Sequence, residues 1–249
     1  MSPNPYASGV PVEPTVLAAT RSSLHEVAEQ VLAADLYRHI GRIGLRPALG
    51  GFGTPWVIVD GAKRSARVES TELVLIVGEE RTAAPLRTIR EAAALLDVVP
   101  GAPAVYTPAT SVDLDRPLVV DPAAAEVVAE WFAFGSNALE RLLAAHPEMA
   151  DSAGPPTLWP EHFDLAVTVA DGVRGEVVLG VSPGDDADPD PYAYVAPSEL
   201  GRGLVATDDW WNRPWGRWVP TGDIATTDDL VAFYEDGFRH VRRGAGGPG

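Results

Sequence analysis

The sequence predicts an α+β fold, in which antiparallel β-sheets pack against long helices. Three observations favour it: stretches with helical apolar spacing are followed by short β-rich runs, the turns between those runs are tight, and the order helix–strands–helix occurs twice. Tight turns join antiparallel strands, whereas parallel strands need long crossover connections. The antiparallel arrangement is therefore favoured over a doubly wound parallel sheet.

The first predicted helix spans residues 15–40, where apolar residues recur at helical spacing. The residues on this apolar face are Leu24, Val27, Ala28, Val31 and Leu32. The helix begins either near Pro14 or at a capping box made by Ser23 and Glu26. The sequence leaves these two starts open.

A strand-rich stretch follows the first helix over residues 43–59. Residues 65–69 and 72–77 then predict a β-hairpin with its turn at residues 70–71. The apolar spacing of residues 86–96 predicts a short helix that closes this half of the chain.

The second half begins after residues 98–117, whose proline and small residues predict a connection between halves. Asp121 and Pro122 then predict a helix start, with Asp121 as the N-cap and Pro122 as the first helical residue. Apolar spacing continues to about His146. Proline residues after that point end the helix.

Short strands follow this second long helix. Residues 164–169 and 176–181 predict two strands paired through a turn at Asp171-Gly172, and residues 192–195 predict another strand. A last helix is predicted over residues 228–242 with a cap at Thr227. Its inward-facing residues are predicted to be Leu230, Phe233, Tyr234 and Phe238. No residue-level repeat accompanies the repeated helix–strands–helix order.

The domain organisation follows from these elements. Residues 15–243 are predicted to form a single globular α+β domain with two lobes, about 15–100 and 118–243. Residues 1–14 carry four prolines and predict a flexible arm, and residues 244–249 predict a disordered tail. Hydrophobic residues make up 46% of the chain, which is enough for a sizeable core.

Charge and composition exclude several function classes. The net charge of −16 argues against nucleic acid, because a polyanion is bound by a basic surface, and it argues equally against anionic membranes. The chain has no cysteine, which excludes disulfides, thiol catalysis and cysteine zinc sites. No signal peptide and no apolar run of roughly 20 residues is present, so we expect a soluble cytoplasmic protein.

Three short patterns resemble catalytic or binding motifs but lack what the chemistry needs. Ser182 lies in a Gly-x-Ser-x-Gly pattern, yet the next residue is Pro183, which has no N–H for an oxyanion hole. The acidic residues 185–190 lack the glycine and glutamate of an EF-hand, which leaves a solvated loop or a looser cation site. The glycines of residues 50–53 fit a bulge or a turn better than a phosphate-binding loop.

His162 is the main candidate for chemistry, with Asp164 beside it. A histidine next to carboxylates can shuttle protons or bind a metal. If residues 161–164 are extended, His162 and Asp164 share one face and Glu161 points away. The competing interpretation is a buried, hydrogen-bonded histidine that holds the start of the strand. No metal ligand set is predicted, and the sequence leaves the cofactor unknown.

Aromatic residues provide the second candidate site. Tyr192 and Tyr194 alternate along a predicted strand and therefore point to one face. The tryptophans between residues 210 and 218 either stack on a ligand or fill the open end of a sheet. The predicted ligand-binding residues are Trp159, His162, Tyr192, Tyr194 and Trp211.

Several blocks of this chain resemble a family of soluble proteins from high-GC bacteria, known only as a domain of unknown function. The resemblance is carried by Gly50-Gly51-Phe52-Gly53-Thr54-Pro55 and by Leu158-Trp159-Pro160-Glu161-His162-Phe163-Asp164. Three shorter blocks are also similar: Arg42-Ile43-Gly44-Leu45-Arg46, Ser182-Pro183-Gly184-Asp185 and Pro191-Tyr192-x-Tyr194-Val195. The resemblance covers most of the chain. It implies no activity, so no catalytic role is carried over.

Three functions remain open from the sequence. The first is a non-enzymatic protein that binds a small molecule or a protein partner in an aromatic pocket. The second is a hydrolase or isomerase that uses His162 as acid or base, with Asp164 orienting the imidazole. One variant of this second function adds a metal ion that assists the reaction. The third is a purely structural or oligomer-forming protein. An open cavity at His162 would separate the first two from the third, in which the aromatic cluster is sealed in the core.

Overall fold

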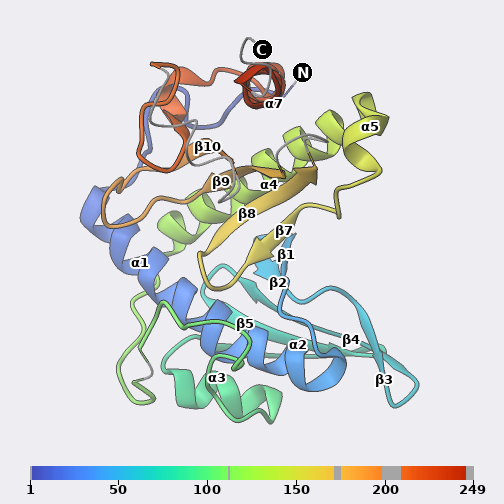
Figure 1. Ribbon diagram of the computed structural model, residues 1–249. Coiled ribbons are helices and arrows are strands. Elements are labelled where there is room, and N and C mark those ends of the chain that lie inside the picture. The colour runs from blue at the N-terminus through green and yellow to red at the C-terminus, as the bar shows by residue number, and fades with distance from the viewer. Residues whose placement is uncertain (1, 112, 171–174, 198–208, 245–249) are drawn as a thin grey trace. The chain divides into compact units, whose positions relative to one another are not determined.

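The computed structural model describes residues 2–111, 113–170, 175–197 and 209–244 of the 249-residue chain. It confirms the α+β class, with two antiparallel sheets and several helices (Figure 1). No helix among these residues combines the length and apolarity needed to cross a bilayer. The chain divides into two compact units: unit 2 holds Val12–Ala133 and Leu158–Asp164, and unit 1 holds Met1–Pro11, Phe134–Thr157 and Leu165–Gly249. This division falls within a helix, whereas the sequence placed the connection between lobes at residues 98–117.

One long helix of unit 2 runs from Pro14 to Ile40 and contains a π-helical turn (Figure 1). Its parts are α1 (Pro14–Val27), η1 (Ala28–Leu32) and α2 (Ala33–Ile40). Of the two starts that the sequence left open, the structure has the one at Pro14. Ser23 and Glu26 instead lie buried within α1. The helix ends at Gly41, whose φ of 67° is a left-handed conformation that glycine adopts readily.

The sheet of unit 2 is a six-stranded antiparallel meander in the order β1-β2-β4-β5-β6, with β3 also paired to β4. Its strands are β1 (Arg46–Ala48), β2 (Gly51–Gly53), β3 (Val57–Val59), β4 (Ala62–Glu69), β5 (Glu72–Val77) and β6 (Glu80–Pro85). The β4–β5 pair confirms the predicted hairpin. The sequence did not predict β6. Helix α3 (Ile89–Leu96) confirms the short helix and packs against α1, η1 and β5.

The glycine-rich block of β2 lies in the sheet, as the sequence favoured. A side chain at Gly51 would place its Cβ 2.2 Å from the carbonyl oxygen of Val68, and one at Gly53 would place it 2.4 Å from that of Ala66. Glycine is therefore required at both positions by the close approach of β4.

Buried polar side chains of the long helix hold the irregular segment that follows α3. The Glu29 carboxylate accepts hydrogen bonds from the backbone N–H of Ala109 at 2.9 Å and of Thr110 at 2.7 Å. The Gln30 side chain accepts from the backbone N–H of Ala102 at 2.9 Å and donates to the Thr110 hydroxyl at 2.8 Å. This segment is thus an ordered part of unit 2, because the helix supplies the partners that its backbone lacks.

The same helix holds the approach to the next helix. Ser23 accepts a hydrogen bond from the backbone N–H of Val119 at 2.9 Å, and Thr20 accepts one from that of Asp121 at 3.0 Å. Asp121 in turn accepts from the backbone N–H of Ala124 at 3.0 Å. The predicted N-cap at Asp121 is therefore confirmed.

Helix α4 (Pro122–Ala145) carries the boundary between the units, and the remaining helices belong to unit 1. These are α5 (Pro147–Ala150), the short 3-10 helix η3 (Thr221–Asp223) and α7 (Thr227–Gly244). The cap of α7 lies one residue before the predicted Thr227. Thr226 and Asp229 bond reciprocally there, since each side chain accepts the other's backbone N–H, at 2.8 and 3.3 Å. Leu230, Tyr234 and Phe238 are buried as predicted, whereas Phe233 is half-buried.

The second sheet has the order β11-β10-β9-β8-β7 and is antiparallel in the registers of β8 to β11. Its strands are β7 (Thr157–Trp159), β8 (Asp164–Ala170), β9 (Glu176–Ser182), β10 (Tyr192–Pro197) and β11 (Arg217–Pro220). The predicted strands at 164–169, 176–181 and 192–195 are confirmed. The predicted turn at Asp171-Gly172 lies outside the described residues. The sequence did not predict β11.

The two faces of this sheet differ. Val181 of β9 and Val195 of β10 point to one face, where Gly135 of α4 and Gly237 of α7 lie against them. Gly180 and Tyr194 alternate with these valines and point to the other face. The second face therefore carries the aromatic side chains.

Part of the predicted flexible arm is held in unit 1. Asn4 donates from its side-chain amide to the carbonyl oxygens of Thr221 at 2.9 Å and Ile224 at 2.7 Å. Thr227 donates from its backbone N–H to the carbonyl oxygen of Ser2 at 2.9 Å. Asn4 and Tyr6 are buried. These hydrogen bonds hold Ser2 and Asn4 in unit 1, although the proline content of this segment predicted a flexible arm. Residues 245–249 of the predicted tail lie outside the described residues.

Candidate functional site

Trp159, His162 and Asp164 belong to unit 2, where they lie on and beside a tight turn. The backbone N–H of Phe163 donates to the carbonyl oxygen of Trp159 at 2.8 Å. Phe163 has a φ of 52°, a left-handed conformation that is uncommon for a bulky residue. Because the chain turns here, the expectation of an extended segment, with His162 and Asp164 on one face, does not apply. His162 is exposed and Asp164 is buried.

A second histidine lies beneath this turn, and the sequence analysis missed it. Nε2 of His25 donates to the carbonyl oxygen of Pro160 at 2.8 Å. Its ring stacks on that of Phe163, with centroids 5.2 Å apart and planes 11° apart. Burial lowers the pKa of His25, Glu29 opposes that effect, and a charge on His162 adds to it. His25 is therefore neutral near pH 7 and orders the turn through its N–H.

Several buried polar atoms of unit 2 have no hydrogen-bond partner among the described residues, and Oη of Tyr106 and Oε2 of Glu161 are two of them. Burial raises the pKa of Tyr106, and the charges of Glu29 and Glu161 raise it further. Tyr106 thus remains a protonated phenol. Glu29 is not free for chemistry, because it holds the backbone of residues 109–110.

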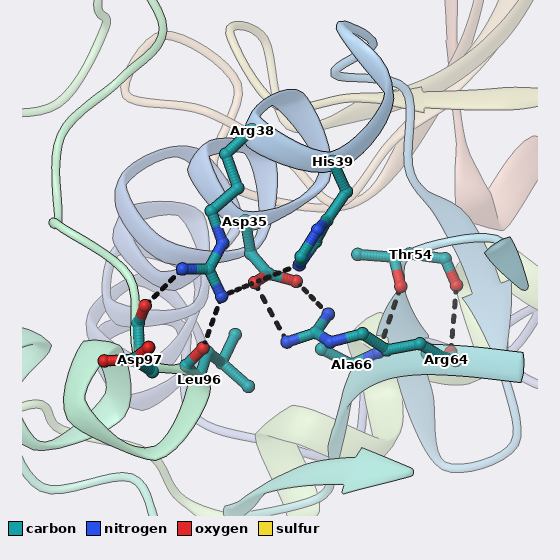
Figure 2. A network of polar contacts seen from close by, with 9 residues as sticks. Asp35, Arg38, His39, Thr54, Arg64, Ala66, Leu96 and Asp97 are labelled. Carbon is teal, nitrogen blue, oxygen red and sulfur yellow. Dashed lines mark hydrogen bonds and ion pairs between the residues drawn. The ribbon is translucent and has the colours of Figure 1, made fainter. Parts of the chain in front are cut away.

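A further network in unit 2 joins α2, α3 and β4 (Figure 2). The buried Asp35 carboxylate forms a two-point ion pair with Arg64, and Nη2 of Arg38 lies 3.3 Å from it. Arg38 also donates to the carbonyl oxygens of Leu96, at 2.8 Å, and Asp97, which lie at the end of α3. Burial lowers the pKa of His39, which lies 3.7 Å from Asp35. Apart from His39, these groups form contacts that join α2 to α3 and to β4. We therefore interpret the network as structural.

The aromatic side chains of unit 1 form a contiguous group on the second face of the sheet. We define the aromatic cluster as Tyr192, Tyr194, Trp215 and Trp218. The rings of Tyr192 and Tyr194 lie 6.2 Å apart, and Trp215 lies 6.4 Å from Tyr192 and 5.8 Å from Tyr194. Trp218 lies 6.0 Å from Tyr192. The tyrosines are 6% and 8% exposed, whereas both tryptophans are half-buried. Tryptophan surface is therefore accessible at the rim of this cluster.

The aromatic cluster depends on a glycine in the neighbouring strand. A Cβ at Gly180 would lie 2.7 Å from the Tyr194 ring and 2.8 Å from the carbonyl oxygen of Leu165. The Tyr194 ring thus lies directly against the β9 backbone. Tyr234 of α7 donates to the carbonyl oxygen of Gly180 at 3.0 Å, which fixes the strand there.

A closed ring of contacts holds the rim of the cluster. The Tyr192 hydroxyl donates to Asp185 at 2.8 Å, and Asp185 accepts from the backbone N–H of Asp188 at 2.9 Å. Asp188 pairs with Arg213 at 2.5 Å, and the Arg213 guanidinium lies 4.3 Å from the centre of the Trp218 ring. Trp218 then packs against Tyr192. This arrangement brings aromatic rings, carboxylates and a guanidinium together at the rim of the aromatic cluster.

The free edge of β11 is closed by a side chain. The Asn212 amide donates to the carbonyl oxygen of Trp218 at 2.9 Å, and its oxygen accepts from the backbone N–H of Trp218 at 2.9 Å. Asn212 thus takes the place of a neighbouring strand. The indole N–H of Trp218 is buried and has no hydrogen-bond partner among the described residues.

Trp211 is placed apart from the tyrosines with which the sequence grouped it. It packs against Trp210, with ring centres 4.7 Å apart, and against His240 at 5.6 Å. The neighbours of Tyr192 and Tyr194 are Trp215 and Trp218 instead. Trp159 and His162 belong to unit 2, and Tyr192, Tyr194 and Trp211 to unit 1, so each set is described within its own unit.

Two motif interpretations from the sequence can be compared with the structure. The Ser182 hydroxyl accepts from the backbone N–H of Gly184 at 3.2 Å and lies at the end of β9 with no helix after it. This arrangement is a strand end and a turn, as the missing N–H of Pro183 indicated. Among the described parts of the chain, no three histidine, aspartate or glutamate side chains are grouped so that they could hold a metal ion.

No protein-family model, no curated protein and no solved structure matches this chain.

Proposed function

We propose that this chain is a binding protein whose ligand rests on the aromatic cluster of unit 1. The observation that carries the proposal is that hydrogen bonds and strand pairing fix Tyr192 and Trp218, while Trp215 and Trp218 stay half-buried. A rigid aromatic surface loses little conformational entropy on binding. Less of the free energy gained from its contacts is therefore offset by that entropy cost.

The aromatic face supports binding of a small molecule or of a side chain from a partner better than it supports strand addition. A peptide that extends the sheet at β11 needs the outward backbone groups of that strand. Asn212 already bonds both of those groups at Trp218. The ligand therefore approaches the rings rather than the strand edge.

Fluorine NMR of protein labelled with 5-fluorotryptophan tests this proposal. The chain has seven tryptophans, so each signal is assigned by a single substitution. We expect aromatic fragments such as indole, adenine and nicotinamide to shift the signals of Trp215 and Trp218. Trp56, an exposed tryptophan of unit 2, is the internal control and should not shift. Equal shifts at Trp56 and the cluster, or no shift at millimolar fragment, would reject the proposal.

The matched pair Trp215→Ala and Trp56→Ala completes the test. Trp215→Ala should abolish the fragment-induced shift of Trp218, because it removes one of the two half-buried tryptophans of the cluster. Trp56→Ala should leave that shift unchanged.

A second candidate function is general acid–base catalysis by His162, in a hydrolase or an isomerase. The observation that favours it is the exposed His162 on a strained turn, with the neutral His25 beneath it. A panel of p-nitrophenyl esters, phosphates and glycosides tests the hydrolase version. If His162→Ala still turns over a substrate, His162 is not the catalytic acid or base. If His162→Ala loses turnover while the control His146→Ala keeps it, catalysis by His162 is supported.

A further inference from the structure

The rim of the aromatic cluster already holds a guanidinium group, that of Arg213. Its Nη2 lies 2.5 Å and its Nε 3.3 Å from the two carboxylate oxygens of Asp188. The carbon at the centre of the group lies 4.3 Å from the centre of the Trp218 ring. A fork-shaped pair with a carboxylate and a stack on an indole are the two contacts that a guanidinium prefers.

Nη1 of Arg213 also donates to the backbone carbonyl oxygen of the adjacent Asn212 at 3.3 Å. The two side chains that receive the guanidinium, Asp188 and Trp218, are positioned without it. Asp188 is fixed by a turn, in which its backbone N–H donates to Asp185 at 2.9 Å and its carbonyl oxygen accepts from the Asp185 N–H at 2.8 Å. Trp218 is fixed by its pairing with Tyr194, by Asn212 and by the ring of Tyr192. Withdrawal of the Arg213 side chain would therefore leave Asp188 and Trp218 in place.

Arg213 itself can leave more easily than its partners can move. Its side chain is 31% exposed, against 17% for Asp188. Its backbone pairs with Gly216, in a short loop that precedes β11. The side chain can therefore rotate into solvent while the loop keeps its shape.

We propose that Asp188 and Trp218 form a binding site for a guanidinium group of the ligand, and that Arg213 occupies this site in its absence. The inference rests on the proposed function and names the chemistry that the ligand presents to the aromatic cluster. Arg213 then acts as a tethered competitor. The apparent affinity for an external guanidinium is lowered by the fraction of molecules in which Arg213 fills the site.

A neighbouring contact shows why the carboxylate matters. The guanidinium of Arg217 lies 4.8 Å from the centre of the Trp210 ring, a stack similar to that of Arg213 on Trp218. Arg217, however, donates to the carbonyl oxygen of Trp210 and has no carboxylate partner among the described residues. The carboxylate beside this indole, Asp236, already accepts the Trp210 indole N–H at 3.1 Å and lies 4.0 Å from the guanidinium of Arg239. Removal of Arg217 therefore uncovers an indole whose nearby carboxylate is engaged, and it should create no site.

The test titrates fluorotryptophan-labelled protein with two guanidinium probes. N-acetyl-arginine amide represents a small ligand, and the capped peptide Gly-Gly-Arg-Gly-Gly represents a partner segment. The corresponding lysine peptide is the control.

We expect Arg213→Ala to lower the Kd for an arginine probe by about fivefold relative to wild type. Arg213→Lys, which keeps a cation in place, and Arg217→Ala should match wild type. Adding Asp188→Asn to Arg213→Ala should abolish binding. Arg213→Ser replaces Arg213→Ala if the latter does not fold.

Each outcome supports or overturns the inference. Binding of both arginine probes supports a small guanidinium ligand, and binding of the peptide alone supports a partner segment. No tighter binding in Arg213→Ala, equal binding of the lysine peptide, or binding that survives Asp188→Asn would overturn the site. If aromatic fragments still shift Trp215 and Trp218 in that case, the proposed function stands and only the guanidinium site fails. If neither class of probe binds, both fail.

Discussion

The two units pack an antiparallel sheet against helices in similar ways but differ in what their polar side chains bond to. In unit 2, Glu29, Gln30 and Asp35 are buried and bond to backbone groups or to arginines that join helices to strands. In unit 1, Asp185 and Asp188 bond to the side chains of Tyr192 and Arg213 at the rim of the aromatic cluster.

This difference separates structural polar groups from candidates for binding. A buried carboxylate that satisfies backbone N–H groups cannot exchange its partners without unfolding the segment that it holds. A carboxylate at a rim can exchange one guanidinium for another while the backbone remains in place. Perturbed pKa values alone would not have made this separation, because those of His25 and Tyr106 are shifted in unit 2 and that of His146 is shifted in unit 1.

The largest expected effect is in unit 2, at the ion pair of Asp35 and Arg64. Asp35→Ala leaves Arg64, whose side chain is 8% exposed, as an unpaired buried charge. We expect the free energy of unfolding, measured in urea, to fall by about 3–5 kcal/mol. The control is Asp115→Ala, which removes an exposed partner of Arg90 and should change stability far less. A similar small effect for both variants would show that Asp35 is not structural.

The second expected effect is in unit 1, where Gly180→Ala should disturb the aromatic cluster itself. The new Cβ would lie 2.7 Å from the Tyr194 ring and 2.8 Å from a backbone oxygen, so the ring must move. We expect a loss of about 1–3 kcal/mol in the free energy of unfolding, together with shifted signals of Trp215. Gly222→Ala, where nothing lies within 4 Å of the added Cβ, is the matched control. Unchanged Trp215 signals in Gly180→Ala would contradict the packing described.

The sequence predicted most of the regular fold because periodic apolar patterns and turn signals are local. Asp121-Pro122 indicated the start of α4, and the alternation around Tyr192 indicated β10 and its shared face. The structure of residues 101–110 could not be predicted, since it depends on Glu29 and Gln30, about 80 residues away in sequence for the contacts to Thr110. Such contacts leave no period in the segment that they order.

The candidate site was predicted in part. Tyr192 and Tyr194 share a face, as their spacing indicated, but Trp215 and Trp218, rather than Trp211, are their neighbours. Residues 210–218 show no apolar period, so nothing in the sequence ranks their four tryptophans. His25 was missed because its contact with Pro160 joins residues 135 positions apart.

A pair of tyrosine substitutions sharpens the comparison between units. Tyr192→Phe removes the hydroxyl that donates to Asp185, so we expect the free energy of unfolding to fall by about 0.5–1.5 kcal/mol. Tyr106→Phe removes a buried hydroxyl that has no partner among the described residues, so stability should stay equal or rise. Urea unfolding of both variants measures the difference. A larger loss for Tyr106→Phe would mean that its hydroxyl is bonded in solution.

The smallest expected effect is a pH dependence in unit 1 that comes from His146. Its Nε2 donates to Glu235 of α7 at 2.8 Å and its Nδ1 to Glu148 of α5 at 3.2 Å, and Glu235 is the main cause of its raised pKa. The folded state therefore binds the proton more tightly than the unfolded chain does. This stabilisation is fully present below the ordinary pKa of 6.5 and is lost as the pH rises through the higher folded value.

Because the His146 side chain is 27% exposed, we expect the stabilisation to be only a few tenths of a kcal/mol, as for other surface pairs. His25 and His39, whose pKa values are lowered, act in the opposite direction and lose stability as the pH falls. The measurement is therefore the difference in unfolding free energy between wild type and His146→Gln from pH 5 to pH 9. That difference should shrink as the pH rises above 6.5. A difference that is constant with pH would mean that His146 contributes through packing or neutral hydrogen bonds rather than through its charge.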